Sequence, residues 1–232
     1  MTALPDMGPT GLLVCDVDST FLQQEVIELV AEHAGVRDRV EEVTAAAMRG
    51  ELDFAASLRE RVALLAGLDE PALEAVRNEL LPTDGALELV ARARAAGWVT
   101  ALVSGGFHEV IDPLATSSGI DHVVANRFDI DTDANDVRVL SGSVLGPIID
   151  AAAKRNALLR FAAEHGVPRE RTVAVGDGAN DLQMIRAAGL GIAFRAKPVL
   201  RAAADETLDG PSLMDAWPLL ERITDGPGPR ER

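Results

Sequence analysis

The chain has 232 residues, of which 47% are hydrophobic and 25% are charged, and its formal net charge at pH 7 is -15. This length suits one domain with a buried core, or one domain that carries an inserted module. The negative charge argues against binding to nucleic acid, because such binding depends on Lys and Arg side chains that neutralise backbone phosphates. A small phosphorylated ligand is compatible with it, since a metal ion or local cations can offset the overall field.

The sequence also indicates where the protein works. It contains no run of about 18 apolar residues, and its first residues, MTALPDMGPT, lack a basic segment followed by an apolar one. The single cysteine, Cys15, agrees with a reducing compartment. We therefore expect a cytoplasmic protein without membrane or nucleic-acid partners, acting as a monomer or homodimer on a small molecule.

Short apolar, β-branched runs recur along the chain, and helical segments separate most of them. The runs are GLLVCDVD (11–18), WVTALVSG (98–105), HVVAN (122–126), RTVAVGD (171–177) and LGIAF (190–194). Apolar runs that do not alternate with polar residues are typical of strands buried on both faces of a parallel sheet. The sequence thus predicts an α/β fold with a doubly wound, Rossmann-like parallel sheet.

Two stretches depart from this pattern. Between residues 23 and 81 four helical segments follow one another without a convincing strand, which is too long for a simple crossover. We interpret residues 23–81 as a small helical cap domain inserted after the first strand, with residues 1–22 and 82–232 forming the catalytic core. The segment RFDIDTDANDVRVLSG (127–142) predicts a hairpin around its Asp/Asn-rich turn.

Polar residues and glycines gather where the predicted strands end. They are Asp16 and Asp18 after the first strand, Ser104, Gly105 and Gly106 after the second, and Asp177, Asn180 and Asp181 after a later one, while Lys154 stands near the start of the helix before that later strand. Ligands of open α/β sheets bind beyond the carboxyl ends of the strands. These residues are therefore expected to form one site, and their chemistry suits a hard divalent cation and a phosphoryl group.

A phosphoryl-transfer site explains why two aspartates stand two residues apart at a strand end. Mg²⁺ shared by Asp16 and Asp177 reduces both their mutual repulsion and the repulsion of an incoming phosphate. Asp16 is ionised at neutral pH because the ordinary pKa of an aspartate is about 3.9. It can therefore attack phosphorus and form an aspartyl-phosphate. Asp18 is placed to protonate the departing alkoxide and then to activate water, which calls for a raised pKa. Lys154 and the Ser104 hydroxyl would hold the non-bridging oxygens.

Four motifs carry a resemblance to a known family. DVDST, SGG, the isolated Lys154 and GDGAND resemble, in order and spacing, the motifs of the haloacid-dehalogenase-like hydrolases. The match extends further, because DVDSTFLQQEVIELVAEHAG, AMRGELDFAASLRERVALL, LVSGGF, VVANR and VAVGDGANDLQMI are similar to the phosphoserine phosphatases of that superfamily. The similarity covers roughly residues 11 to 216.

The resemblance implies a role for each matching residue. It implies Asp16 as nucleophile, Asp18 as general acid and base, and Mg²⁺ held by the carboxylates of Asp16 and Asp177 and by the main-chain carbonyl of Asp18, with Asp181 close behind. The positions that match phosphate-handling residues are Ser104, Gly105, Lys154 and Asn180. The positions that match substrate-recognising residues of the cap are Glu25, Met48, Phe54 and Arg61.

The cap residues agree in chemistry with phosphoserine, which carries an ammonium and a carboxylate beyond its phosphate. Glu25 can pair with the ammonium, and Arg61 can hold the carboxylate with its planar fork. Met48 and Phe54 could close over the site, although such residues at helical spacing are more often core. Lys197, in AFRAKP, is taken as a surface residue, and the four histidines as structural.

We therefore expect an Mg²⁺-dependent phosphatase that hydrolyses O-phospho-L-serine to L-serine and phosphate, at the last step of serine biosynthesis. Two alternatives use the same scaffold: a phosphotransferase from phosphoserine to an alcohol such as homoserine, and a phosphatase for another small phosphomonoester. A third, a catalytically silent Mg²⁺- or phosphate-binding regulator, is disfavoured by the intact Asp16 and Asp18.

Overall fold

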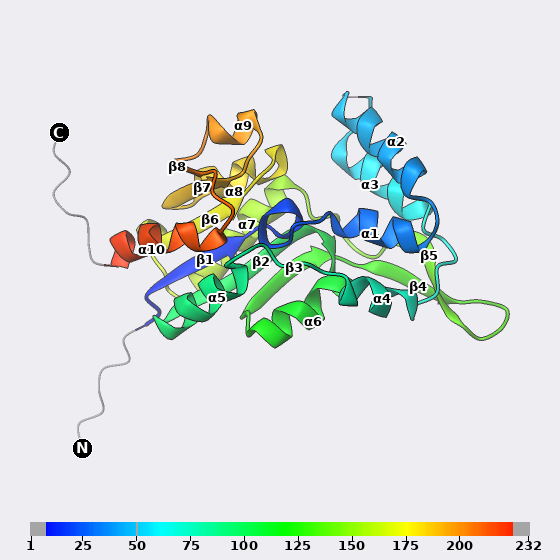
Figure 1. Ribbon diagram of the computed structural model, residues 1–232, viewed down its shortest axis with the longest axis horizontal. Coiled ribbons are helices and arrows are strands. Elements are labelled where there is room, and N and C mark those ends of the chain that lie inside the picture. The colour runs from blue at the N-terminus through cyan, green and yellow to red at the C-terminus, as the bar shows by residue number, and fades with distance from the viewer. Residues whose placement is uncertain (1–7, 50, 225–232) are drawn as a thin grey trace, which may run out of the picture.

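A six-stranded parallel sheet forms the centre of the computed structural model, which describes residues 8–49 and 51–224 (Figure 1). Its strands run in the order β3-β2-β1-β6-β7-β8. Their bounds are β1 (Gly11–Cys15), β2 (Trp98–Phe107), β3 (His122–Asn126), β6 (Thr172–Gly176), β7 (Leu190–Phe194) and β8 (Glu206–Leu208). The five predicted strands are confirmed. The edge strand β8 was not predicted, because its three residues form no apolar run.

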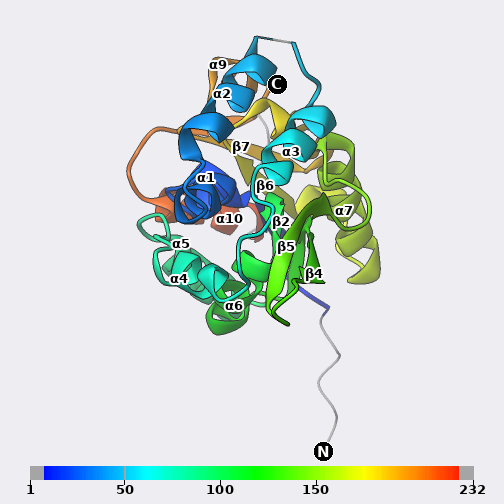
Figure 2. The ribbon, with the colours of Figure 1, turned by 90° about the vertical axis from the view of Figure 1, so that its right-hand side faces the viewer.

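Helices cover both faces of the sheet, as a doubly wound fold requires. Along β1, Leu12 and Val14 pack toward α7, whereas Leu13 and Cys15 pack on the opposite face toward α5 and α6. Figure 2 shows α7 on one side and α5 and α6 on the other. The bounds on the α7 side are α7 (Ala151–Glu164), α8 (Leu182–Ala187) and α9 (Pro198–Arg201), and those on the other side are α5 (Ala86–Ala95), α6 (His108–Ser118) and α10 (Trp217–Thr224). Burial on both faces accounts for the continuous apolar runs.

Four α-helices lie within the described part of residues 23–81, as predicted. They are α1 (Val26–His33), α2 (Arg37–Met48), α3 (Phe54–Ala63) and α4 (Ala72–Asn78). Helix α4 packs against α6 and α1 against β2, while α2 and α3 stand away from the sheet (Figure 1). The two connections of this insert run side by side, because the backbone N–H of Gln23 donates to the carbonyl of Leu81 at 2.9 Å. The domain bounds 23–81 stay a prediction that this arrangement supports.

The predicted hairpin is present, and it joins the insert to the core. Strands β4 (Phe128–Thr132) and β5 (Arg138–Val144) pair in antiparallel fashion. The loop after α3 adds to β5: the N–H of Gly67 donates to the carbonyl of Leu140 at 2.9 Å, and the N–H of Leu140 donates to the carbonyl of Leu68 at 2.8 Å. These backbone bonds anchor the base of α3 to the hairpin, a connection that the sequence pattern did not indicate.

Within residues 8–49 and 51–224, none of the helices combines the length and the apolar character that crossing a membrane would need.

Candidate active site

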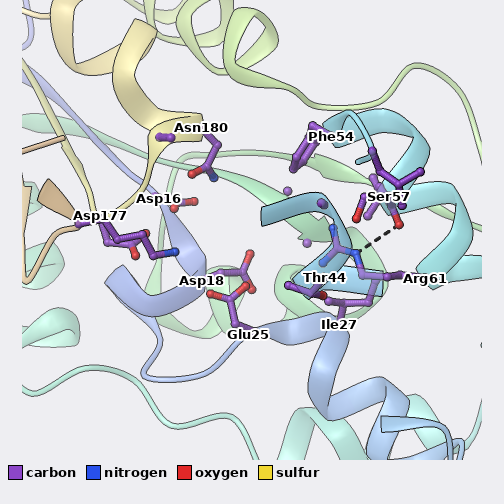
Figure 3. A pocket seen from close by; sticks show the side chains of 17 residues that line it. Asp16, Asp18, Glu25, Ile27, Thr44, Phe54, Ser57, Arg61, Asp177 and Asn180 are labelled. Carbon is purple, nitrogen blue, oxygen red and sulfur yellow. Dashed lines mark hydrogen bonds between the residues drawn. The ribbon is translucent and has the colours of Figure 1, made fainter. Parts of the chain in front are cut away.

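A pocket of about 390 Å³ lies at the carboxyl ends of the central strands, beneath the protruding helices α2 and α3 (Figure 3). Core and insert both contribute to its walls. The predicted site residues that line it are Asp16, Asp18, Gly105, Gly106, Asp177 and Asn180 from the core, and Glu25, Phe54 and Arg61 from the insert. The strand-end rule therefore located this pocket correctly.

A tight turn after β1 brings the two aspartates of the first motif into the pocket. The segment Val17–Phe21 winds through one irregular turn, with Ser19 in the left-handed region at φ 56°. Asp16 stabilises its start, since its Oδ1 accepts from the N–H of Val17 at 2.8 Å. The carboxylate of Asp18 is held at both oxygens: Oδ1 accepts from the N–H of Val26 at 2.7 Å, and Oδ2 accepts from the hydroxyl of Ser104 at 2.9 Å.

Lys154 is bound to carboxylates inside the core. Its Nζ donates to Oδ1 of Asp16 at 2.6 Å and to Oδ1 of Asp181 at 2.8 Å, and its side chain is buried. Lys154 and Ser104 are absent from the lining of the pocket. In this structure both therefore act on the two aspartates of the first motif, and the expectation that they hold phosphate oxygens stays a prediction.

Asp181 organises the loop that follows β6. Its Oδ2 accepts from the backbone N–H groups of Asp177 and Gly178, at 3.2 and 3.1 Å, while Oδ1 accepts from Lys154. Gly176 leaves room for this arrangement, because a β-carbon there would lie 2.5 Å from the Asp181 carboxyl group. With both oxygens engaged, Asp181 supports the loop from behind the pocket.

The carboxylates of this site suit a divalent cation. One oxygen each from Asp16, Asp177 and Asp181 lies within 4.8 Å of the others, and all three residues are buried. Since Asp181 already accepts from Lys154 and two amides, Asp16 and Asp177 are the better ligands. Mg²⁺ is commonly bound by one or two carboxylates together with water and substrate phosphate. The donor set thus fits the expected ion.

Burial changes how these carboxylates ionise. Burial, and then the charge of Asp181, raise the pKa of Asp16 well above its ordinary value, although Lys154 opposes the shift. The ordinary pKa of an aspartate therefore does not describe Asp16 in this site, and its ionised form depends on nearby positive charge. Burial, and then Glu25, raise the pKa of Asp18 to about 6. Burial, and then Asp181, raise the pKa of Asp177 to about 6.

The insert residues face the core across the pocket. Glu25 accepts a hydrogen bond from the hydroxyl of Ser19 at 2.8 Å. The guanidinium of Arg61 donates from Nε to the carbonyl of Ser57 at 3.3 Å (Figure 3). The exposed ring of Phe54 reaches the glycine loop, its Cζ lying 3.4 Å from where a β-carbon of residue 105 would stand. Met48 ends α2, and its side chain lies outside the described part of the structure.

Several lining residues were not predicted. They are Ile27, Thr44, Ala47, Leu52, Ser57, Leu58, Ala179 and Lys197. Lys197 is exposed, as expected of a surface residue, yet it also lines the pocket. A signal for it existed, because it follows the end of β7 by three residues and so obeys the same strand-end rule.

Comparison with known proteins decides the family. The sequence profile of the haloacid dehalogenase-like hydrolases matches residues 13–186. The chain belongs to the haloacid dehalogenase-like hydrolase family. It is 54% identical over 202 residues to a phosphoserine phosphatase of Streptomyces coelicolor, a match that covers 87% of this chain and 48% of that protein. It is 43% identical over 219 residues to the phosphoserine phosphatase of Lactococcus lactis, covering 94% of this chain and 99% of that one.

Solved structures of this hydrolase family agree in fold. A substrate-bound phosphoserine phosphatase superposes with a TM-score of 0.83 at 37% identity, covering 90% of this chain and 98% of that one. A phospho-aspartyl intermediate analogue of phosphoserine phosphatase gives 0.82 at 38% identity with the same coverage. The chain is thus placed among the phosphoserine phosphatases of the haloacid dehalogenase-like hydrolases, and the predicted α/β fold with an inserted helical cap is confirmed. It spans about half the length of the Streptomyces coelicolor relative.

Proposed function

We propose that this protein is an Mg²⁺-dependent phosphoserine phosphatase that hydrolyses O-phospho-L-serine to L-serine and phosphate. One observation carries the proposal: a single pocket holds Asp16 and Asp18 on the core side, and Glu25 and Arg61 on the insert side. Phosphoserine has the complementary layout, with a phosphate at one end and an ammonium and a carboxylate at the other. The reaction would complete serine biosynthesis in the cytoplasm, in keeping with the single, buried cysteine.

Asp16 is the proposed nucleophile, and its surroundings prepare it for attack. The hydrogen bonds from Lys154 and from the N–H of Val17 fix Oδ1, so that the other oxygen is the one directed at phosphorus. Mg²⁺, held by Asp16 and Asp177, would supply positive charge that favours the ionised carboxylate and reduces its repulsion of the phosphate. Attack by Asp16 forms the aspartyl-phosphate and releases the serine alkoxide.

Asp18 is the proposed proton carrier. With a pKa raised to about 6 by burial and Glu25, its carboxyl group can hold a proton for the departing serine oxygen at a pH where an ordinary aspartate could not. After that transfer the carboxylate is ready to take a proton from the water that attacks the aspartyl-phosphate. The bonds from Ser104 and Val26 hold the carboxylate in one orientation for both steps.

The insert, residues 23–81, is the proposed cap over this chemistry. Glu25 would pair with the substrate ammonium and Arg61 with its carboxylate. Phe54 lies against the glycine loop, where its ring can exclude water from the phosphorylated aspartate. A substrate without the amino-acid group would leave both charged residues unpaired, which disfavours it.

The test is phosphate release from L-phosphoserine in Mg²⁺ and in excess EDTA, beside phosphothreonine, phosphoethanolamine and a sugar phosphate. We expect metal-dependent activity with a strong preference for phosphoserine, and none from an Asp16→Asn variant, because an amide cannot form the acyl-phosphate. Equal activity on the other esters would overturn the substrate. Transfer of phosphate to added homoserine, in place of its release, would overturn hydrolysis.

A further inference from the structure

The positive charge available to a phosphate in this pocket is limited. Among the described residues, the basic side chains that line the pocket are Arg61 and Lys197, whereas Asp16, Asp18, Glu25 and Asp177 bring four carboxyl groups to the same walls. Lys154 sits behind the lining with its ammonium bound to Asp16 and Asp181. A phosphate dianion entering the pocket therefore needs a further cation to offset these carboxylates.

The backbone of Lys197 is fixed beside the metal-binding loop. Its N–H donates to the main-chain carbonyl of Asp177 at 2.8 Å, and its own carbonyl accepts from the N–H groups of Leu200 and Arg201 in the first turn of α9. Pro198, which follows it, begins α9. These contacts fix the Cα of Lys197 at the rim of the pocket. Its ammonium makes no ion pair with the described residues.

The two basic residues, Arg61 and Lys197, lie on different sides of the pocket. Lys197 lies beside Asp177, because its backbone N–H donates to the carbonyl of that residue and both residues line the pocket. Arg61 instead faces the acidic groups of Glu25, Asp18 and Glu28. Figure 3 shows Asp177 and Arg61 on opposite sides of the pocket. Lys197 is thus on the phosphate side and Arg61 on the amino-acid side.

We propose that Lys197 is a further substrate-binding residue of this enzyme, whose ammonium contacts the phosphoryl group on the side opposite Arg61. The inference rests on the proposed function, because it takes the core side of the pocket as the place of the phosphate. Lys197 binds the phosphoryl group of the substrate and also the inorganic phosphate that is released. Its removal therefore weakens the binding of every phosphate ligand equally and leaves recognition of the amino-acid group intact.

The experiment compares Lys197→Gln and Lys197→Arg with the wild type and with Arg186→Gln. Arg186 is an exposed arginine of α8 outside the pocket lining, so its variant makes the same change in net charge. Inorganic phosphate is titrated calorimetrically at saturating Mg²⁺, Mg²⁺ is titrated alone, and kcat/KM is measured for phosphoserine and for p-nitrophenyl phosphate.

In Lys197→Gln we expect phosphate affinity and both kcat/KM values to fall together by about ten- to a hundredfold, the range for losing one charge-assisted hydrogen bond. Lys197→Arg should keep most of the phosphate affinity and of both kcat/KM values, and Arg186→Gln should leave all three unchanged. Unchanged phosphate affinity alongside altered Mg²⁺ affinity would overturn the inference, because Lys197 would then only balance Asp177. A loss on phosphoserine alone would also overturn it, placing Lys197 on the amino-acid side.

The design separates this inference from the proposed function. A wild-type protein that binds inorganic phosphate but does not hydrolyse phosphoserine would refute the function, and the phosphate titration would still decide the role of Lys197. An active wild type with an unaltered Lys197→Gln variant would refute the inference alone.

Discussion

The ammonium of Lys154 lies 2.6 Å from Oδ1 of Asp16, and both side chains are buried although 138 residues separate them in the chain. The same ammonium holds Asp181, so helix α7 supplies one positive charge to carboxylates from two neighbouring strand ends. A buried lysine between two aspartates supports the fold as well as the chemistry, because each charge would be costly in the core without the others.

Replacing Lys154 is expected to destabilise the protein. Lys154→Met keeps the length of the side chain but leaves Asp16 and Asp181 buried without a cation, and breaking such a pair costs about 3–5 kcal/mol. Asp16→Asn removes one of two repelling carboxylates and keeps the Lys154–Asp181 pair, so its free energy of unfolding should stay level or rise. Urea unfolding at pH 7 in EDTA measures the free energy of unfolding of both variants. An Asp16→Asn variant that is less stable than the Lys154→Met variant would contradict this prediction.

The pH dependence of turnover should report Asp18. Hydrolysis of the aspartyl-phosphate needs the ionised carboxylate, so kcat for p-nitrophenyl phosphate at saturating Mg²⁺ should fall as pH drops below about 6. Glu25→Gln removes a charge that raises this pKa and should move the acidic limb to lower pH. Ser104→Ala removes a hydrogen bond that lowers the pKa and should move the limb to higher pH. Shifts in the same direction would show that Asp18 does not set the limb.

Arg61 should govern the choice of substrate. Arg61→Ala is expected to lower kcat/KM for phosphoserine by about ten- to a hundredfold, the loss of one charge-assisted interaction, while changing hydrolysis of p-nitrophenyl phosphate little. Arg59→Ala is the matched control, since Arg59 is exposed on the same helix and does not line the pocket. Equal losses on both substrates would assign Arg61 to the fold or to the phosphate.

Metal binding should stabilise the protein more at neutral than at acidic pH. The pKa values of Asp16, Asp18 and Asp177 are raised by folding, so in EDTA these groups stabilise the protein at low pH. Asp18 and Asp177 lose that contribution as pH rises through about 6. Above this pH the ionised carboxylates bind Mg²⁺ and the loss is reversed. The rise in Tm on adding Mg²⁺ should be larger at pH 7.5 than at pH 5 and should disappear in Asp177→Asn. A rise that is larger at pH 5 would contradict the ligand assignment.

Much of the fold and of the site's location could be read from local sequence. The apolar runs ending at Cys15 and Gly176 predicted buried parallel strands, and their polar successors Asp16 and Asp177 predicted a site at one edge of the sheet. This inference works because parallel strands place their carboxyl ends together, whatever packs around them. The short edge strand Glu206–Leu208 was not predicted, since three residues carry no periodic signal.

The sequence by itself determined which chemical groups stand at the strand ends and, through four ordered motifs, the class of reaction they suit. Only the tertiary structure decided which group each side chain contacts: that Lys154 binds Asp16 and Asp181, that Ser104 binds Asp18, and that Lys197 lines the pocket. The reason is physical. Strand and helix periodicity follow from backbone geometry within a few residues, whereas a contact between residues far apart in the chain depends on how separate elements pack and on the burial that this packing imposes.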